Sequence, residues 1–489
     1  MTTDLDVLVV GAGISGINLA YRLTERCPDL SFQVLDAREE IGGTWDLFRY
    51  PGIRSDSDFF TLSFPFRPWR GEDAIVSGEA IMDYLHETVD ATGLRSRIQL
   101  GTKVLSADWS SQTSRWTVKA VREGEPVTYS ARFVVACTGY YDYDNPHDPG
   151  FGDPSAFGGE VVHPQFWPTD LDVSGKRVAV VGSGATAVTL VPALAEAGAS
   201  VTMVQRTPTY VLAQPKSDAL ANGLRKVLAP DLAHQIVRTK NTALQWGLYQ
   251  ACKNAPDLMR SLLRKGAIAA TGSEAVVDEH FNPPYGPWDQ RLCIAPGGDL
   301  YESIRNGQAS VVTGAVKGYV PTGVELDDGR VVEADVVVTA TGLRIKLLGG
   351  IDLSVDGETV DLSQRHVYLG AMLSGLPNAG FCIGYINLSW TMRSDMTARL
   401  LTRVLRRLVD ERLDVVMPVA PAGLPAGGPV MDMPSGYLAR AASVMPRATD
   451  TYPWAMAQNV VKDAWHTNRA DLDDGLVWSR ASQSAGVPR

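Results

Sequence analysis

Two short glycine-rich stretches carry the clearest chemical signal in this sequence. In a G-x-G-x-x-G pattern the first glycine permits a tight turn, the second lets the backbone approach a pyrophosphate, and the third allows close helix packing. The first stretch follows the apolar run that ends at Val10, and Asp36 stands 20 residues beyond it, where a carboxylate can accept from ribose hydroxyls. This pattern predicts a dinucleotide site formed by Gly11, Gly13, Ser15, Gly16 and Asp36.

The second stretch has alanine in place of the third glycine, which the dinucleotide-binding turn tolerates. Its residues are Gly182, Ser183, Gly184, Ala185, Thr186 and Ala187. Where the first unit has its acid, this one has Gln205 and Arg206, followed by Thr207. Loss of the carboxylate removes repulsion against a 2′-phosphate, and a guanidinium can bind that phosphate in a bidentate manner. The second site is therefore predicted to bind NADPH rather than NADH.

Both stretches lie between a predicted strand and a predicted helix. Residues 6–10 and 32–35 are short β-branched runs that flank an amphipathic helix at 14–23, and the pattern repeats with runs at 178–181 and 201–204 around a helix that reaches Ala195. Further strands are expected at 104–109, 116–120, 133–136, 310–313, 323–326 and 336–339, and a helix at 394–409. The predicted fold is α/β, with two Rossmann-like dinucleotide-binding domains and an inserted helical region.

The insert is predicted from apolar and basic positions at helical spacing between Ser217 and about Phe281, a pattern that ordinary packing would also produce. Loops rich in proline and glycine mark the domain boundaries. The expected division is 1–145 with 378–489 for FAD, 146–214 with 291–377 for NADPH, and 215–290 for the helical insert.

Composition excludes several other classes of protein. A net charge of −10 over 489 residues, without a long basic run, argues against a nucleic-acid partner. Five scattered cysteines without a C-x-x-C pair indicate neither a metal site nor a redox-active dithiol, and they fit a reducing, cytoplasmic setting. No signal peptide and no apolar stretch of ~18 residues that would form a transmembrane segment is expected.

A segment ahead of the second turn indicates the family. Residues 157–168 read Phe-Gly-Gly-Glu-Val-Val-His-Pro-Gln-Phe-Trp-Pro, which matches F-x-G-x-x-x-H-x-x-x-W-P. This segment resembles the fingerprint of the Baeyer-Villiger monooxygenases, flavoproteins that use FAD and NADPH. A single His163 is more often structural than catalytic, so we interpret the segment as an interdomain anchor that couples nicotinamide binding to domain movement.

The resemblance extends to the loop at residues 49–58 and to the stretch at 287–293. In the family the loop covers the flavin, and its carboxylate, here Asp56, faces an active-site arginine, here Arg291. Two departures concern NADPH contacts: Gln290 stands where the family usually has lysine, and the residue between the arginine and the following leucine is absent. The position of the first turn early in the chain favours FAD there, as do the downstream residues Gly43, Thr44 and Trp45.

Within the family the chain resembles the ethionamide-activating subgroup. This resemblance implies that NADPH reduces FAD, that oxygen adds to the reduced flavin, and that Arg291 stabilises the resulting flavin peroxide while Asp56 orients the guanidinium. The products would be esters or lactones from small hydrophobic ketones and oxidised sulfur from sulfides or thioamides. The N-terminus of the helix after Trp390 would face the flavin ring.

Three other functions share parts of these motifs. A sulfur- or nitrogen-oxygenating flavin monooxygenase without true Baeyer-Villiger activity would have the same nucleotide turns and would be indifferent to Arg291. A pyridine nucleotide-disulfide reductase has a similar two-domain plan but needs paired cysteines. A flavin-binding redox sensor without turnover is the third alternative, and Gln290 would be its signature.

Overall fold

The first nucleotide-binding unit is built on a nine-stranded sheet in the computed structural model, which describes residues 2–431 and 436–481. The strand order is β18-β17-β4-β5-β6-β1-β2-β3, and β21 also pairs with β6. The core strands β1, β2, β3, β6 and β21 run parallel, whereas β4 and β5 form an antiparallel extension. The bounds are β1 Thr2–Val10, β2 Phe32–Leu35, β3 Ile98–Gln99, β4 Thr102–Ser110, β5 Arg115–Arg122, β6 Glu125–Ala136, β17 Asp352–Val355, β18 Glu358–Thr359 and β21 Ala379–Phe381.

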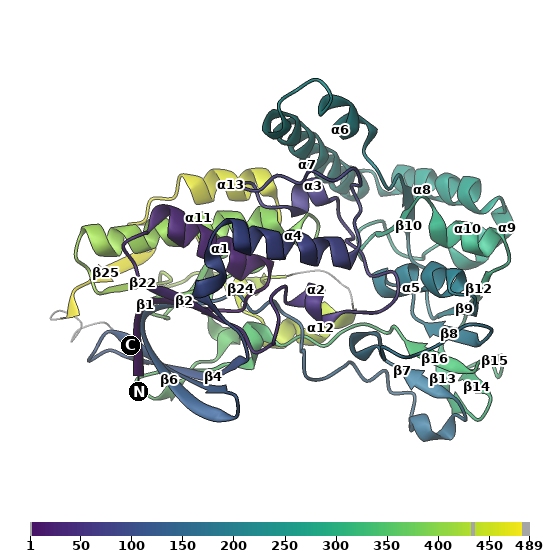
Figure 1. Cartoon of the computed structure of the whole chain (residues 1–489), viewed down its shortest axis with the longest axis horizontal. Coiled ribbons are helices and arrows are strands. Elements are labelled where there is room, and N and C mark those ends of the chain that lie inside the picture. The colour runs from purple at the N-terminus through teal and green to yellow at the C-terminus, as the bar shows by residue number, and fades with distance from the viewer. Residues whose placement is uncertain (1, 432–435, 482–489) are drawn as a thin grey trace.

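Helices from both ends of the chain cover one face of this sheet. Helix α1 (Ile14–Arg26) lies beside α11 (Trp390–Asp410), with α4 (Gly78–Ala91) and α13 (Val460–Asn468) flanking them (Figure 1). The apolar faces of α1 and α11 and the parallel strands form one continuous core. Buried parallel strands need cover of this kind, which explains why β1 reads as a nearly unbroken apolar run from Val7 to Val10.

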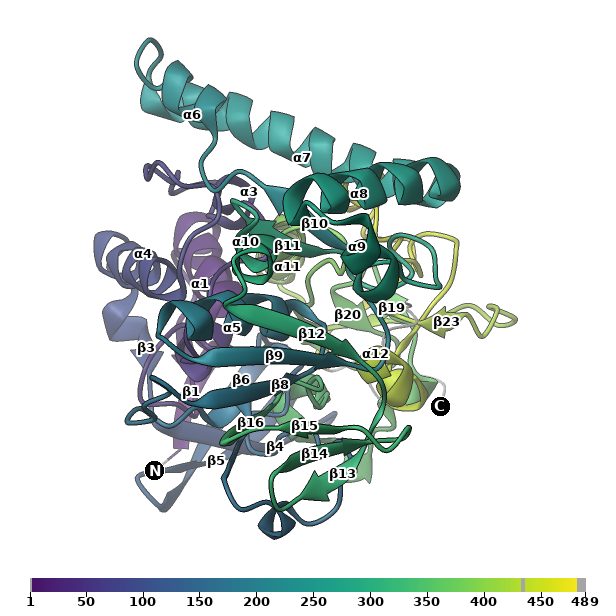
Figure 2. The same cartoon turned by 90° about the vertical axis from the view of Figure 1, so that its right-hand side faces the viewer.

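The second unit is a five-stranded, wholly parallel sheet in the order β12-β9-β8-β16-β7. Helix α5 (Ala185–Glu196) packs on one face, and a three-stranded antiparallel sheet packs on the other, as Figure 2 shows beneath β16. The bounds are β7 Glu160–Val162, β8 Arg177–Val181, β9 Ser200–Gln205, β12 Ala309–Thr313, β16 Val336–Thr339, and for the smaller sheet β13 Val316–Val320, β14 Gly323–Leu326 and β15 Val331–Glu333.

A helical insert separates β10 (Val211–Gln214) from β11 (Cys293–Pro296), which pair with each other and so close its base. It contains α6 (Ala219–Leu224), α7 (Pro230–Asn254), α8 (Pro256–Thr271) and α9 (Glu274–His280). Helices α6 and α7 project beyond the two sheets at the top of both views (Figures 1 and 2). The predicted helical character of this region is confirmed.

The remaining elements are short and connect or edge the two units. They are α2 Thr44–Leu47, α3 Phe59–Leu62, η1 Leu94–Arg97, η2 Pro154–Ala156, η3 Pro164–Phe166, α10 Asp299–Arg305, η4 Leu347–Gly350, η5 Leu362–Gln364, β19 Val367–Tyr368, β20 Met372–Leu373, β22 Val415–Pro418, β23 Gly428–Pro429, α12 Gly436–Ala441, η6 Ala442–Val444, β24 Arg447–Ala448 and β25 Leu476–Ser479. In the described part of the chain, every helix is too short or too polar to cross a bilayer.

One predicted boundary is wrong. The sequence assigns residues up to 377 to the second unit, but β17 pairs in parallel with β4, with Asp352 opposite Ser106. Strand β18 continues this edge. The chain therefore re-enters the first sheet at residue 352, because the edge strand β4 offers free backbone groups that β17 satisfies.

Candidate active site

The first glycine-rich turn has the tight geometry that its pattern predicts. Gly11 has φ +108°, and a Cβ there would lie 2.5 Å from the Cys137 carbonyl oxygen, so the position requires glycine. At Gly13 a Cβ would meet only ordinary contacts, the nearest being Gly43 Cα at 3.6 Å. Gly13, at the N-terminus of α1, also lines the cavity, so a ligand there can reach its backbone.

Asp36 lies at the end of β2 and is buried. Its carboxylate accepts hydrogen bonds from the backbone N–H of Ala12 at 2.6 Å and from that of Arg38 at 2.9 Å. Burial raises the pKa of this carboxyl. The side chain therefore braces the turn, and it borders the same cavity as Gly11.

The residues after β2 and the N-terminus of α11 form the rest of the site around the first glycine-rich turn. Thr44 Oγ1 lies 3.1 Å from the Tyr143 hydroxyl, and burial raises the pKa of Tyr143 to about 12, so that hydroxyl stays protonated. The Trp390 indole donates to Ser15 Oγ at 2.8 Å. This bond ties the first turn to the start of α11, 375 residues away.

The second turn repeats the plan. Gly182 has φ +141°, and a Cβ there would lie 2.2 Å from the Ala340 carbonyl oxygen. At Gly184 an added Cβ would meet nothing within 4 Å. Ser183 Oγ donates to the Thr207 carbonyl at 3.1 Å, which holds the end of β9 against the turn.

Gln205, the last residue of β9, and Arg206, which follows it, differ in placement. Gln205 is buried and donates to the His280 carbonyl at 2.7 Å and to Thr313 Oγ1 at 3.1 Å, so it connects β9 to α9 and β12. Arg206 is exposed. Only Arg206 of this pair is therefore available to a phosphate.

Arg291 and Asp56 meet although 235 positions separate them. Arg291 Nη2 lies 2.8 Å from Asp56 Oδ2, with the side chains 31% and 41% exposed. Asp56 belongs to the loop of the first unit, whereas Arg291 precedes β11 of the second. The ion pair thus bridges the two units in a partly solvated site.

Both units line one cavity of about 780 Å³. A volume of this size suits a bound cofactor or substrate. The predicted site residues that border it are Gly11, Gly13, Ser15, Asp36, Gly43, Thr44, Trp45, Asp56, Ala185, Thr186 and Arg291.

Other predicted residues lie outside the described lining of this cavity. Gly16 and Ala187 pack against their own units, because a Cβ at Gly16 would lie 1.8 Å from the Gly11 carbonyl oxygen and Ala187 is fully buried. Gly182, Ser183, Gly184, Arg206 and Thr207 also lie outside the described lining.

His163 has a structural environment. It caps η3, where its Nδ1 accepts from the Gln165 N–H at 3.2 Å, and burial lowers the pKa of its imidazole to about 4. Gln165 in turn donates to the Asp142 carbonyl at 2.8 Å. These contacts connect the fingerprint segment to the loop that leaves the first sheet.

Two sets of contacts at this site cannot be predicted from the spacing of residues in the sequence. Arg54 forms an ion pair with Asp299 at the start of α10, with Nη2 to Oδ1 at 3.3 Å, so a second bridge joins the units near Asp56. Asp58 is buried and bound by side chains of α7. Their partners lie roughly 180 to 245 positions away, a separation at which spacing predicts nothing.

Two cysteines that are distant in sequence lie side by side. Phe381 is in register with Ala136, which places Cys382 next to Cys137. Hydrogen bonding to Cys382 and burial raise the pKa of the Cys137 thiol. Disulfide chemistry needs an accessible thiolate, so this environment does not suit a disulfide reductase.

Comparison with known proteins shows the family to which the chain belongs. A family model described as pyridine nucleotide-disulphide oxidoreductase matches residues 8–222. The FAD-containing monooxygenase EthA of Mycobacterium tuberculosis is 43% identical over 489 residues, with 100% of each chain covered. The chain belongs to the FAD-containing monooxygenases. This monooxygenase is also 43% identical over 480 residues to the probable FAD-binding monooxygenase AlmA of Acinetobacter baylyi, covering 98% of this chain and 96% of that one.

Solved structures show the same fold for this monooxygenase. A steroid monooxygenase bound to NADP superposes with a TM-score of 0.77 at 21% identity, and a cyclohexanone monooxygenase with 0.78 at 19%, each over 98% of this chain and 100% of that chain. The monooxygenase OTEMO, in complex with FAD and NADP, gives 0.76 at 20% identity over 97% of this chain and 99% of that one. The similarity to EthA confirms the predicted likeness to an EthA-type, FAD-containing monooxygenase, and the solved structures confirm the two-Rossmann architecture.

Proposed function

We propose that this monooxygenase binds FAD and NADPH and is a Baeyer-Villiger enzyme that converts ketones to esters or lactones and oxidises sulfide or thioamide sulfur. The observation that supports it best is the Arg291–Asp56 pair, which borders the cavity shared by both units. The FAD-containing relatives and the solved neighbours with FAD and NADP support the cofactors.

The residues fit these cofactors. Gly13 lines the cavity at the N-terminus of α1, where aligned N–H groups favour a pyrophosphate, and the buried Asp36 stands at the edge of the same cavity. Gly184 leaves open space at the N-terminus of α5, and the exposed Arg206 can bind a 2′-phosphate. Bound FAD supplies the reduction of oxygen at the expense of NADPH.

The proposed role of Arg291 is electrostatic. Arginine stays protonated in proteins, so its guanidinium can stabilise negative charge on activated oxygen and on the alkoxide formed from a ketone. Asp56 accepts from Arg291 Nη2 and would orient the guanidinium toward the cavity. Neither residue needs to transfer a proton.

The proposed substrates are small and hydrophobic. The cavity walls include aromatic and aliphatic side chains such as Trp45, Tyr385, Leu388 and Trp390. The neighbour named for cyclohexanone acts, by its name, on a cyclic ketone.

The five unpaired cysteines support a reducing, cytoplasmic location.

The test is product analysis with oxygen-18 gas. The FAD-loaded protein is incubated with NADPH, a phenyl ketone and a thioether, and products are measured by mass spectrometry. Labelled ester together with labelled sulfoxide is the expected result. Labelled sulfoxide alone would favour the sulfur- and nitrogen-oxygenating alternative, and the absence of NADPH consumption would favour a redox sensor.

The Arg291→Ala variant tests the site itself. It should retain FAD and lose ester formation by at least about 100-fold, the usual effect of removing one donor that stabilises a developing oxyanion. Arg305→Ala, an exposed arginine on α10, is the matched control. Undiminished ester formation by Arg291→Ala would overturn the assignment.

A further inference from the structure

We propose that helix α7 is a clamp that holds Asp56 and Arg291 in register, and that Gln245 and Lys253 are positioning residues of the active site. This inference rests on the proposed function of the ion pair. The clamp consists of Asn241, Gln245, Tyr249 and Lys253, which recur at every fourth position and so share one side of the helix.

The first half of the clamp binds Asp58, two residues after Asp56. Asn241 Nδ2 donates to Asp58 Oδ1 at 3.0 Å, and Gln245 Nε2 donates to Asp58 Oδ2 at 2.5 Å. Asp58 also caps α3 by accepting from the Thr61 N–H at 3.1 Å. Since the carboxylate is only 4% exposed, water does not replace these donors readily.

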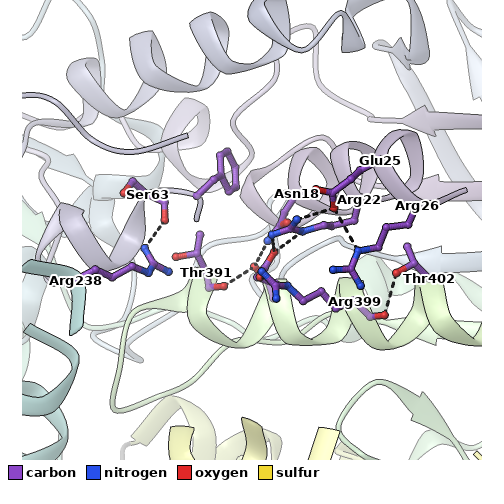
Figure 3. A network of polar contacts seen from close by, with 12 residues as sticks. Asn18, Arg22, Glu25, Arg26, Ser63, Arg238, Thr391, Arg399 and Thr402 are labelled. Carbon is purple, nitrogen blue, oxygen red and sulfur yellow. Dashed lines mark hydrogen bonds and ion pairs between the residues drawn. The ribbon is translucent and has the colours of Figure 1, made fainter. Parts of the chain in front are cut away.

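Arg238 reinforces the same end of the clamp. One turn before Asn241, its Nη1 donates to the carbonyls of Phe60 and Ser63, both at 2.8 Å. Figure 3 shows Arg238 directed at Ser63. Thr391 of α11 donates to the Thr61 and Leu62 carbonyls from another side. The segment from Asp58 to Ser63, directly after the loop that carries Asp56, is therefore fixed between α7 and α11.

The second half of the clamp contacts the loop that carries Arg291. Lys253 Nζ lies 3.0 Å from Asp289 Oδ1, and the Tyr249 ring meets the Trp288 ring edge-on at 5.5 Å between centroids. Asp289 is two residues before Arg291. Asp289 Oδ2 also accepts from the Gly286 N–H at 2.8 Å, so Lys253 holds a carboxylate that closes a turn.

The turn at residues 286–289 depends on contacts from α7 because its backbone is strained. Trp288 has φ +66°, a left-handed conformation that bulky residues rarely adopt. Removal of the α7 contacts would let the turn relax toward ordinary φ values and shift Arg291. The eight residue steps from Gln245 to Lys253 span about 12 Å of helix, which fixes the distance between the two loops.

The two ends of the clamp should differ in strength. The Gln245–Asp58 bond is partly buried and ends on a buried carboxylate, whereas the Lys253–Asp289 pair is 39% and 44% exposed and is screened by water. Loss of Gln245 is therefore expected to have the larger effect. A misplacement of about 1 Å at a reacting group can lower a rate roughly 100-fold, so small shifts are sufficient.

The test measures backbone hydrogen exchange in the full-length, FAD-loaded protein and in three variants. Gln245→Met removes the donor and keeps the length of the side chain, Lys253→Met removes the charge, and Gln235→Met on the exposed face of α7 is the matched control. We expect Gln245→Met to increase exchange about ten-fold in residues 55–61 and also in residues 286–292. Increased exchange in residues 55–61 alone would overturn the clamp.

Two substitutions at Lys253 then test whether it acts through Asp289, which stays unchanged because its Oδ2 also closes the turn at Gly286. Lys253→Glu, which places a like charge beside Asp289, should lower the fraction of NADPH oxidation that gives oxygenated product, whereas Lys253→Arg, which keeps the cation, should leave that fraction near the native value. An unchanged fraction in Lys253→Glu would remove Lys253 from the clamp. Because exchange does not depend on the reaction, coupled exchange without any oxygenated product would sustain the clamp and reject the proposed function.

Discussion

At the scale of single residues, the exposed guanidinium of Arg206 should decide the choice of nicotinamide cofactor. Arg206→Ala removes a charge-assisted contact to the 2′-phosphate, so the Michaelis constant for NADPH should rise about 10- to 100-fold. The constant for NADH should change little, because NADH lacks that phosphate. Steady-state kinetics with both cofactors check this expectation, and equal effects on both would assign the phosphate to another residue.

The buried Asp58 carboxyl predicts a specific dependence of stability on pH. Burial raises its pKa, so the folded protein takes up a proton at this site at a higher pH than the unfolded chain does. Its contribution to stability therefore grows as pH falls from neutrality toward the ordinary pKa of an aspartate, whereas the amide of Asp58→Asn does not titrate. The difference in melting temperature between the native protein and this variant should shift in favour of the native protein on acidification, and thermal scans at several pH values measure it.

Sequence reasoning predicts some of the site residues better than others. Asp36 and Arg206 follow from local spacing, because a nucleotide turn dictates what stands at the end of the next strand. The Arg291–Asp56 pair follows only from the family resemblance, since 235 intervening positions carry no geometric information. The Arg54–Asp299 bridge and the bonds of Asp58 were missed, because both depend on how the insert and the two units pack together.

At the scale of elements, alanine substitutions of the turn glycines should have two different effects, one on cofactor binding and one on folding. An added Cβ at Gly184 meets nothing within the protein, so Gly184→Ala should keep the fold and FAD but raise the Michaelis constant for NADPH by about ten-fold or more, a cost of ~1.4 kcal/mol or more. The methyl group would occupy space that the pyrophosphate needs.

Gly16→Ala is the contrasting variant. Its Cβ would lie 1.8 Å from the Gly11 carbonyl oxygen, so α1 would have to move away from β1. We expect loss of bound FAD and a lower yield of folded protein, measured by flavin absorbance and circular dichroism. A fully flavinylated Gly16→Ala protein would contradict the packing role.

The βαβ units were predictable because each is local, with strand, turn and helix contiguous in the chain. The spans 32–35, 323–326 and 336–339 match β2, β14 and β16 at both ends. Strand β17 was assigned to the wrong unit, because its partner β4 lies some 240 residues earlier and the pairing depends on sheet topology. Local pattern identifies strands, and their neighbours across the sheet follow from tertiary packing.

At the scale of the whole molecule, a buried ion pair joins the two ends of the chain. Arg22 of α1 and Asp395 of α11 lie 2.8 Å apart, with side chains 4% and 8% exposed, and Arg399 also binds Asp395 at 2.8 Å (Figure 3). Asp395→Asn leaves Arg22 buried beside a neutral amide, so stability should fall by about 3 kcal/mol.

Denaturant unfolding followed by flavin fluorescence measures this loss. The exposed Asp410, which pairs with Arg406 on the same helix, gives the control Asp410→Asn, for which the change should stay below about 0.5 kcal/mol. Equal effects of the two substitutions would show that burial of the pair adds nothing to its importance.

The separation of Arg22 from Asp395 also sets the order of events during synthesis. A ribosome that adds 5–20 residues per second needs about 20 to 75 s to make the 373 residues between them. During that interval the parallel sheet of the second unit, complete by Thr339, can fold, while α1 still lacks the helix that covers it. The nascent first unit therefore exposes apolar surface, and its Arg22 lacks the Asp395 partner, for most of translation, which makes it the part of the chain that a chaperone would bind.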